Sequence, residues 1–386
     1  MTEFFRYENL TWPEIEALPR DTALILPLGH GYPLDRLASV LGNPMRVGLL
    51  PVIPFGWIGS GLTVPGKVLK GLLENLLESL REDGFSRAYA LIPPGLGLDL
   101  GANHITLPHP THYTLSAPMP TDHERGKVVI IPIGHTEQHG YHLPMSTDSL
   151  IINAIGQGAA LQDPEHCISL PVMPYGVSTH RSAFAGTLNC GGRAFEDFWL
   201  SIIDVLVARG FDRFYLISGH GGNTSFLVNV IKYAGERHRG IFCATSWLYL
   251  SGPVGIAALE RYRESPIGGM GHACELETSL IQFLCPELVH MDRVIDEMDF
   301  VSTPSYYMDW VEGGALIANP PWDDDTRTGS YGAGSLGSPE KGRIWLEAAI
   351  FEKVTHVSEI HQQFTLRIAR RQGGFGLWGK QKSAQS

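Results

Sequence analysis

Three short segments recur in the same order along this 386-residue chain, and this repetition constrains its fold more than any other feature. The pairs are LILPLGHG at 24–31 with VIIPIGHT at 129–136, LLPVIPFG at 49–56 with SLPVMPYG at 169–176, and DGFSRAYALI at 83–92 with RGFDRFYLIS at 209–218. A helical stretch separates the second landmark from the third in both copies. An ordered triple match indicates the duplication of a whole domain, because its period far exceeds that of short solenoid repeats.

The repeated segments contain apolar runs that predict buried strands. TALILPLG at 22–29, KVVIIPIG at 127–134 and RFYLISG at 213–219 are rich in β-branched residues and end in glycine. Such runs are typical of a mostly parallel sheet with helices on both faces. Between the last two runs, Phe195, Trp199 and Ile202 share one face of a predicted helix that ends at Gly210. We therefore expect an α/β fold.

Composition narrows the class of partner. The net charge of −11 argues against nucleic acid or an anionic membrane surface and favours a small-molecule substrate. The five cysteines are scattered and odd in number, so they predict neither a disulfide framework nor a thiolate zinc site. The N-terminus does not resemble a signal peptide, and no uncharged stretch reaches the roughly 20 residues of a membrane-spanning helix. These features favour a cytoplasmic location.

The segment GHTEQHGYHLPMSTD at 134–148 concentrates residues that bind metals. Glu137 and His139 follow one predicted strand, Asp148 precedes a helical run, and His220 in SGHGGN follows another strand. The carboxyl ends of neighbouring parallel strands are where α/β sheets place their sites. Mixed carboxylate and imidazole ligands suit Zn²⁺, Mn²⁺ or Fe²⁺, and one aspartate could bridge two such ions.

Each of these residues also has a purely structural interpretation. Asp148 could be a helix N-cap, and His220 a hydrogen-bonded loop histidine in an anion-binding nest. His142 is better interpreted as a structural or supporting histidine than as a ligand. The first copy provides an internal comparison. At the positions of Glu137, His139, Asp148 and His220 it has Tyr32, Leu34, Asn43 and Pro94. The candidate ligands are present together in the second copy only, which favours the metal site.

The repeat predicts two domains of one type, at residues 1–110 and 111–386. Residues 105–126 are rich in proline and in turn residues, which indicates the junction. The first domain is expected to be a degenerate copy that keeps the fold and lacks the metal ligands.

The segments IPIGHTEQHGYHLPMSTD, LPVMPYG, AFAGTL, SGHGGN, GHACELETS and GSPEKG together resemble the creatininase family, also called creatinine amidohydrolase-like proteins. The resemblance covers residues from about 127 to 355, and LTWPEIEALPRDTALILPLG at 10–29 resembles the family's usual opening. It implies a three-layer α/β/α domain with two metal ions and a metal-activated water. By motif, Glu137 and His220 would hold one ion, His139 the other, and Asp148 would bridge them.

The chain departs from the family pattern at the second ion. Creatinine-hydrolysing members have a glutamate two residues after the GH histidine, where this chain has Gly222. GHACELETS supplies replacements: Glu277 is the first choice and Glu275 the second, although either could lie on a helix surface. His272 in the same segment matches the family's proton-shuttling histidine, a role suited to a group that titrates near neutral pH.

Two further residues are candidates for substrate binding. Arg181 replaces part of the EH motif of many members and could pair with a carboxylate, phosphate or polyol oxygen, or could lie on the surface. If it faces the pocket, creatinine is disfavoured as the substrate, since that ring has no anionic group. Trp247 could gate the pocket, although a buried aromatic is the ordinary interpretation.

The resulting expectation is a metal-dependent amidohydrolase that cleaves a C–N bond, other than a peptide bond, in a small, cyclic, polar substrate. The resemblance also admits C–C ring opening of a cyclic polyol diketone, as in the family's 3-dehydro-scyllo-inosose hydrolase. A non-catalytic metal-binding scaffold is the alternative from another class. Single-domain relatives resemble subunits of ring-shaped hexamers built from dimers. A homo-oligomer is therefore expected, in which the two halves of each chain form an internal pseudo-dimer.

Overall fold

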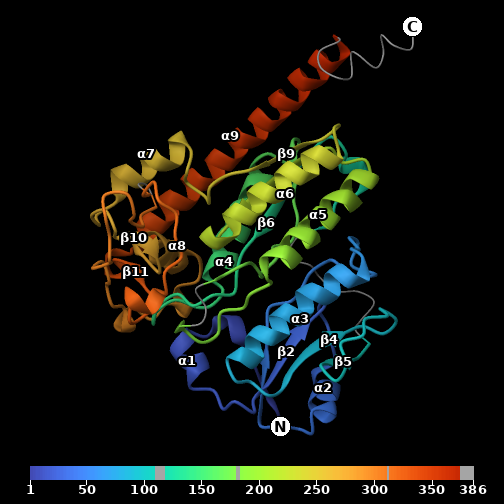
Figure 1. The fold of residues 1–386 in the computed structure, drawn as a ribbon, viewed down its shortest axis with the longest axis vertical. Coiled ribbons are helices and arrows are strands. Elements are labelled where there is room, and N and C mark those ends of the chain that lie inside the picture. Colours follow the sequence, from blue (N-terminus) through green and yellow to red (C-terminus); the bar gives the residue numbers. More distant parts are fainter. Residues whose placement is uncertain (109–117, 180–182, 311–312, 374–386) are drawn as a thin grey trace.

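The computed structural model describes residues 1–108, 118–179, 183–310 and 313–373 (Figure 1). Within them, one five-stranded sheet has the order β1-β3-β2-β4-β5, and one four-stranded sheet has the order β7-β6-β8-β9. The first sheet comprises β1 (Glu3–Arg6), β2 (Ala23–Pro27), β3 (Arg46–Leu49), β4 (Ala88–Ile92) and β5 (His104–Thr106). The second comprises β6 (Val128–Ile133), β7 (Cys167–Ser169), β8 (Arg213–Ser218) and β9 (Phe242–Thr245). A short antiparallel pair joins β10 (Met270–His272) to β11 (Tyr331–Gly332).

Helices connect and cover these strands. They are α1 (Trp12–Glu16), α2 (Leu34–Val40), α3 (Gly66–Glu82), α4 (Thr147–Gln162), α5 (Gly192–Ala208), α6 (Thr224–Arg237), α7 (Pro253–Tyr262), α8 (Glu275–Leu284) and α9 (Pro339–Gln372). Helix α5 ends where the sequence predicts, because Gly210 takes a φ of 93°, a left-handed conformation that favours glycine. No helix in the described part of the chain is both long enough and apolar enough to cross a membrane.

The two sheets share one connectivity. In each, the central strand is followed by a helix and then by the neighbouring strand on one side. A second helix then leads from that strand across to the neighbour on the other side of the central strand. Strand β2 lies between β3 and β4, and β6 lies between β7 and β8, all in parallel. The predicted α/β fold with mostly parallel sheets is confirmed.

The two halves share a hydrophobic core. One cluster of buried side chains contains Leu69, Leu73 and Leu76 of α3 together with Phe198 and Trp199 of α5, and these two helices pack side by side between the sheets (Figure 1). Burial of each such side chain contributes about 1.5–3 kcal/mol relative to exposure. Neither half could be removed without exposing this apolar surface on the other.

The central strand of the second sheet is apolar on both faces, as its sequence predicts. Val129, Ile131 and Ile133 join the core shared with α5, whereas Val128 and Ile130 join a separate cluster with α4, α8 and α9. A strand buried in this way can hold polar groups only beyond its ends. The polar side chains of this part of the chain therefore lie in the segment that follows β6.

Candidate metal centre

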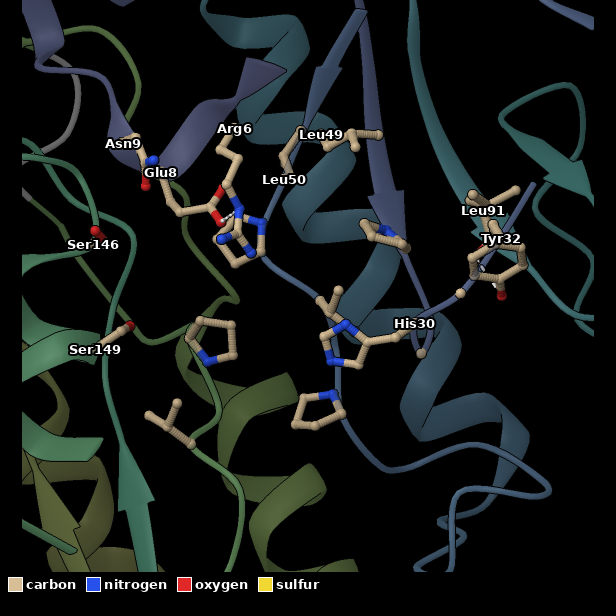
Figure 2. Close-up of a pocket in the computed structure, with 18 of the residues that line it drawn as sticks. Arg6, Glu8, Asn9, His30, Tyr32, Leu49, Leu50, Leu91, Ser146 and Ser149 are labelled. Atoms are coloured by element: carbon tan, nitrogen blue, oxygen red, sulfur yellow. Dashed lines mark hydrogen bonds and ion pairs between the residues drawn. The ribbon is translucent and has the colours of Figure 1, made fainter. Parts of the chain in front are cut away.

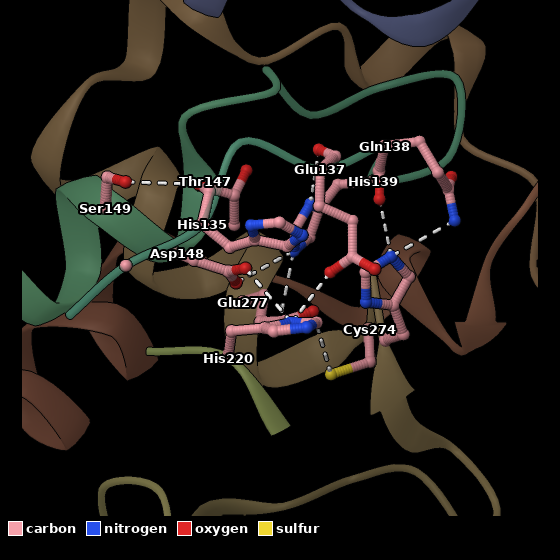
Figure 3. A network of polar contacts seen from close by, with 12 residues as sticks. His135, Glu137, Gln138, His139, Thr147, Asp148, Ser149, His220, Cys274 and Glu277 are labelled. Carbon is pink, nitrogen blue, oxygen red and sulfur yellow. Dashed lines mark hydrogen bonds and ion pairs between the residues drawn. The ribbon is translucent and has the colours of Figure 1, made fainter. Parts of the chain in front are cut away.

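Four of the predicted ligands lie together at the carboxyl edge of the second sheet (Figure 3). Glu137 and His139 follow β6, and His220 follows β8, whose last residue is in register with the last residue of β6. Asp148 is the second residue of α4 and not its N-cap, which is Ser146. The four residues are at most 7% exposed. Adjacent parallel strands thus bring loops that are distant in sequence to one buried place.

His139 and His220 each have one ring nitrogen fixed by a backbone carbonyl. His139 Nδ1 lies 3.0 Å from the carbonyl oxygen of Glu137, and His220 Nε2 lies 3.0 Å from that of Val177. Because a carbonyl oxygen only accepts hydrogen bonds, these two nitrogens carry the hydrogen. In a neutral ring, His139 Nε2 and His220 Nδ1 then present lone pairs. Histidines that ligate metals are held in the same way.

Both lone pairs face carboxylate oxygens. His139 Nε2 lies 3.1 Å from Asp148 Oδ1, and His220 Nδ1 lies 2.8 Å from Glu137 Oε2 and 3.4 Å from Asp148 Oδ2. Glu137 Oε2 and Asp148 Oδ2 make no hydrogen bond of regular geometry within the described residues. Buried acceptors that face one another repel unless a proton or a metal cation lies between them. This donor set fits divalent cations, with Asp148 placed between the two histidines.

The electrostatics of the cluster agree with this geometry. Burial opposes ionisation of Asp148, yet His139 and His220 lower its pKa to about 2. Burial likewise opposes ionisation of Glu137, but His220 holds the pKa of that carboxyl well below its usual value. Burial disfavours the charged form of His220, but Glu137 and Asp148 raise its pKa to about 10. The carboxylates therefore remain ionised and require positive charge beside them.

Helix α8 carries both glutamates considered for the second ion, and they face different surroundings. Glu277 Oε1 lies 3.8 Å from His139 Nε2, and Glu277 groups with His139 and Asp148. Glu275 instead accepts hydrogen bonds from the backbone N–H groups of Glu264 and Ser265 and pairs with Lys341 Nζ at 2.7 Å. Residues two apart on a helix point about 200° apart. Only Glu277 can face the cluster, whereas Glu275 serves the packing of α9.

His272, at the end of β10, lies against the same cluster. Its Nε2 is 2.6 Å from the carbonyl oxygen of Gln138, so this nitrogen donates. The His272 ring lies 4.1 Å from that of His139, and His272 groups with Glu137 and His139. Burial and the neighbouring His139 lower the pKa of His272. The ring is therefore neutral near pH 7, with Nδ1 as its acceptor atom.

His135 is a site residue for which the sequence predicted no role. It is fully buried, its ring lies 4.4 Å from that of His220, and it groups with Glu137 and His220. Its Nδ1 accepts the backbone N–H of Gly176 at 2.9 Å, so its Nε2 carries the hydrogen. His135 is thus a hydrogen-bond donor to the site and not a lone-pair ligand. The sequence shows that His135 follows the apolar run of β6, which places it near the site. It does not show the hydrogen bond from Gly176 that decides which ring nitrogen donates.

Of the other residues that the sequence singles out, the structure describes Trp247 and His142. Trp247 is 51% exposed rather than buried, and a Cβ placed on Gly221 would lie 3.9 Å from its ring, so it stands beside the loop that carries His220. Arg181 lies outside the described residues. His142 hydrogen-bonds Thr278 Oγ1 at 2.9 Å and belongs to none of the ligand groups found in the described part of the chain.

Gly222, which replaces the family's glutamate, has no room for a side chain in this structure. A Cβ there would lie 2.4 Å from His220 Nε2 and 2.5 Å from the carbonyl oxygen of Val177. The packing of the loop around Gly222 therefore excludes the glutamate that other family members have at this position.

Comparison with known proteins identifies relatives of the second half. A family model for creatininase, described as creatinine amidohydrolase, matches residues 115–357. Creatinine amidohydrolase from Pseudomonas putida is 28% identical over 243 residues, which cover 58% of this chain and 85% of that protein. The mycofactocin precursor peptide peptidase of Mycobacterium ulcerans is 31% identical over 173 residues, which cover 43% of this chain and 62% of that protein. The 3-dehydro-scyllo-inosose hydrolase of Thermotoga maritima is 25% identical over 255 residues, which cover 61% of this chain and 78% of that protein.

Solved structures agree with the sequence comparison. A structure named creatininase Mn superimposes with a TM-score of 0.52 at 25% identity, and the match covers 63% of this chain and 93% of that one. The family model spans more than half of the chain and includes every residue of the cluster. The chain therefore belongs to the creatininase family of hydrolases.

Proposed function

We propose that this chain is a hydrolase that depends on two divalent metal ions, zinc, manganese or iron, and cleaves a C–N bond of a small, cyclic, polar substrate. The observation that carries the proposal is the pair of histidine nitrogens, His139 Nε2 and His220 Nδ1, that face ionised carboxylates while the other nitrogen of each ring is fixed by a backbone carbonyl. Glu137 and His220 would hold one ion, His139 and Glu277 the other, and Asp148 would bridge them. Glu277 takes the place of the glutamate that Gly222 cannot supply.

The chain's own groups would perform the proton transfers. When bound, the ions supply water activation and polarisation of a carbonyl oxygen. His272 is held by the carbonyl oxygen of Gln138 at Nε2, so it would accept a proton at Nδ1 and deliver it to the leaving nitrogen. The Nε2–H of His135 would donate a hydrogen bond to negative charge beside Glu137. Trp247, beside the loop that carries His220, would contact the substrate, and Arg181 remains a candidate for substrate binding.

The relatives support hydrolysis of an amide over the alternatives. The names of two of them, creatinine amidohydrolase and a peptide peptidase, indicate cleavage of a C–N bond. The 3-dehydro-scyllo-inosose hydrolase supports C–C ring opening as the second candidate. A non-catalytic metal-binding scaffold is disfavoured, since the relatives named above are hydrolases and a peptidase.

The first half would act as a built-in partner of the second. Helices α3 and α5 occupy corresponding places in the two connectivities and pack on each other. We propose that residues 1–110 are a degenerate copy of the catalytic domain of residues 111–386, and that the halves form an internal pseudo-dimer within a homo-oligomer.

Metal analysis followed by a substrate screen tests the proposal. Purified protein should contain one to two transition-metal ions per chain by mass spectrometry. It should then hydrolyse at least one compound among cyclic amides, lactams, short peptides and cyclic diketones. Turnover of a diketone but of no amide would assign the C–C reaction instead. Less than one ion per chain, with no loss of structure or activity after chelation, would reject the enzyme.

A matched pair of variants separates the site from the rest of the chain. Asp148→Asn removes the charge between the two histidines and should abolish both metal retention and turnover. Asp197→Asn makes the same chemical change on the exposed surface of α5 and should affect neither. Equal metal content in the two variants would contradict the assignment of Asp148 as a ligand.

A further inference from the structure

Tyr249 is a fully buried tyrosine whose hydroxyl has no hydrogen-bond partner within the described residues. Such a hydroxyl is unfavourable for folding, because it has given up its hydrogen bonds to water without gaining one from the protein. A buried polar group in this state therefore requires an explanation. Glu137 Oε2, Asp148 Oδ2 and His135 Nε2 are in the same state, and all three belong to the metal centre. The position of Tyr249 indicates that its hydroxyl serves the same centre.

The segment that carries Tyr249 contacts the loop of His220. The two segments follow β9 and β8, which are adjacent parallel strands, so they lie at the same edge of the sheet. A Cβ placed on Gly221 would lie 3.9 Å from the ring of Trp247 and 4.0 Å from Leu248 Cδ1. The residues that directly precede Tyr249 therefore pack against the loop that carries a proposed metal ligand.

Trp310 holds Tyr249 from the other side. Its ring lies 4.7 Å from that of Tyr249, and its Nε1 donates a hydrogen bond to the Tyr249 carbonyl oxygen at 3.1 Å. The backbone N–H of Trp310 donates to the carbonyl oxygen of Met270 on β10 at 2.6 Å. Strand β10 leads directly into α8, which carries Glu277. Tyr249 thus lies between the loop of His220 and the elements that end in Glu277.

The backbone is strained on both sides of Tyr249. Leu248 has a φ of 44° and Leu250 a φ of 61°, a left-handed conformation that is unfavourable for residues other than glycine. Ser246 Oγ donates to the carbonyl oxygen of Leu248 at 3.0 Å, and both leucines are buried. Strain of this kind persists where the surroundings enforce it, and it is common at functional sites. The strained turn keeps the side chain of Tyr249 inside the protein.

The electrostatic neighbours of the Tyr249 hydroxyl include two proposed metal ligands. Burial raises the pKa of Tyr249 well above its usual value, and the charges of Glu277, Cys274 and Asp148 raise it further. The hydroxyl therefore stays protonated and is available as a donor. Glu277 has room for one, since within the described residues its Oε2 accepts a long contact of 3.9 Å from Cys274 Sγ. Carboxylates that ligate metals are normally hydrogen-bonded by a supporting group.

We propose that Tyr249 is a positioning residue of the metal centre, whose hydroxyl donates a hydrogen bond to the Glu277 carboxylate when Glu277 holds the second ion. This inference rests on the proposed function, in which Glu277 is a ligand of that ion. The hydroxyl has no partner in the metal-free fold, so its removal costs that fold no hydrogen bond. A tyrosine with a purely structural role would behave in the opposite way.

Tyr249→Phe removes the hydroxyl alone and tests the proposal. The metal-free, full-length protein is titrated with Mn²⁺ by isothermal calorimetry, and its melting temperature is measured before and after loading. The second ion is identified as the one whose binding Glu277→Gln removes. In Tyr249→Phe, the affinity for this ion should fall about 10–100-fold, and that for the first ion should change less than about threefold. The melting temperature of the metal-free variant should equal or exceed that of the metal-free parent.

Tyr32→Phe is the matched control. Tyr32 lines a cavity between the two halves (Figure 2), and none of the proposed metal ligands lines that cavity. Its hydroxyl donates to the carbonyl oxygen of Leu28 at 2.6 Å. Tyr32→Phe should therefore lower the melting temperature of the metal-free protein and leave both Mn²⁺ affinities unchanged.

Two results would overturn the role of Tyr249. One is a Tyr249→Phe variant that binds the second ion as tightly as Tyr32→Phe does. The other is a Tyr249→Phe variant whose metal-free melting temperature falls as far as that of Tyr32→Phe, because the hydroxyl would then have a structural partner. If the parent binds two ions and Tyr249→Phe binds them equally well, this inference alone fails. A parent that binds no second ion would overturn the proposed two-ion centre as well.

Discussion

Gly222→Ala should disturb the metal centre through a single hydrogen bond. The added Cβ would lie 2.4 Å from His220 Nε2 and 2.5 Å from the carbonyl oxygen of Val177, the two atoms that form the 3.0 Å hydrogen bond. Both contacts are far shorter than real Cβ atoms tolerate, and the carbonyl belongs to the backbone. The ring of His220 must therefore move, and its Nδ1 turns away from Glu137 and Asp148.

The size of the effect follows from the role of the lost bond. Partners that orient a ligating histidine are worth about 10–100-fold in metal affinity, or about 1.4–2.7 kcal/mol. Gly221→Ala is a matched control one residue away, since its Cβ would meet nothing closer than 3.9 Å. Neither glycine has a positive φ, so the two substitutions differ mainly in what the methyl group contacts.

Competition with a chromogenic chelator measures the metal affinity of both variants, and thermal unfolding reports whether each remains folded. Gly222→Ala should lose about 10–100-fold in affinity for the ion that His220 holds, and Gly221→Ala less than about threefold. Equal affinities in the two folded variants would refute the argument that the bond between His220 and Val177 orients a ligand.

Three further predictions test other parts of the structure. Glu277→Gln should reduce the metal content towards one ion per chain, whereas Glu275→Gln should keep the metal and lose about 1–3 kcal/mol of stability, because it removes one of the two carboxylates that pair with buried Lys341 and leaves Glu264 as its partner. Burial raises the pKa of Asp83 to about 6, above its unfolded value, so its stabilising contribution is complete below pH 3.8 and is lost as the pH rises through 6. Relative to Asp83→Asn, the parent should therefore lose up to about 3 kcal/mol of unfolding free energy between pH 4 and pH 8, measured by urea titration, and parallel pH profiles would contradict this. A fragment of residues 111–386 exposes the apolar face of α5 and should aggregate, and a soluble, fully active fragment would show that the first half is dispensable.

Much of this arrangement is predictable from local sequence because its physical causes are local. A strand that is apolar on both faces is buried in a parallel sheet, and polar residues just beyond its end are carried to the sheet's edge. Glu137, His139 and His220 satisfy that condition, which is why their proximity could be inferred without coordinates. Asp148 could be inferred as well, since it opens the helix that follows the same loop.

Other features depend on partners that are far away in the sequence. The choice between Glu275 and Glu277 depends on Lys341 and on backbone groups near residue 264, which mark Glu275 as a packing residue. The donor character of His135 depends on the N–H of Gly176. No local pattern contains this information, because the contact of Glu275 with Lys341 spans 66 residues and that of His135 with Gly176 spans 41.

The sequence by itself determined the alternation of strands and helices, the order of the repeated landmarks and the kinds of ligand available, since these follow from the period and polarity of neighbouring residues. The tertiary structure alone decided which ring nitrogen of each histidine faces the carboxylates, which glutamate joins them, and that a cavity remains between the halves. The reason is physical: backbone pattern sets where a side chain starts, but its hydrogen-bond partners decide where its lone pairs and charges are directed.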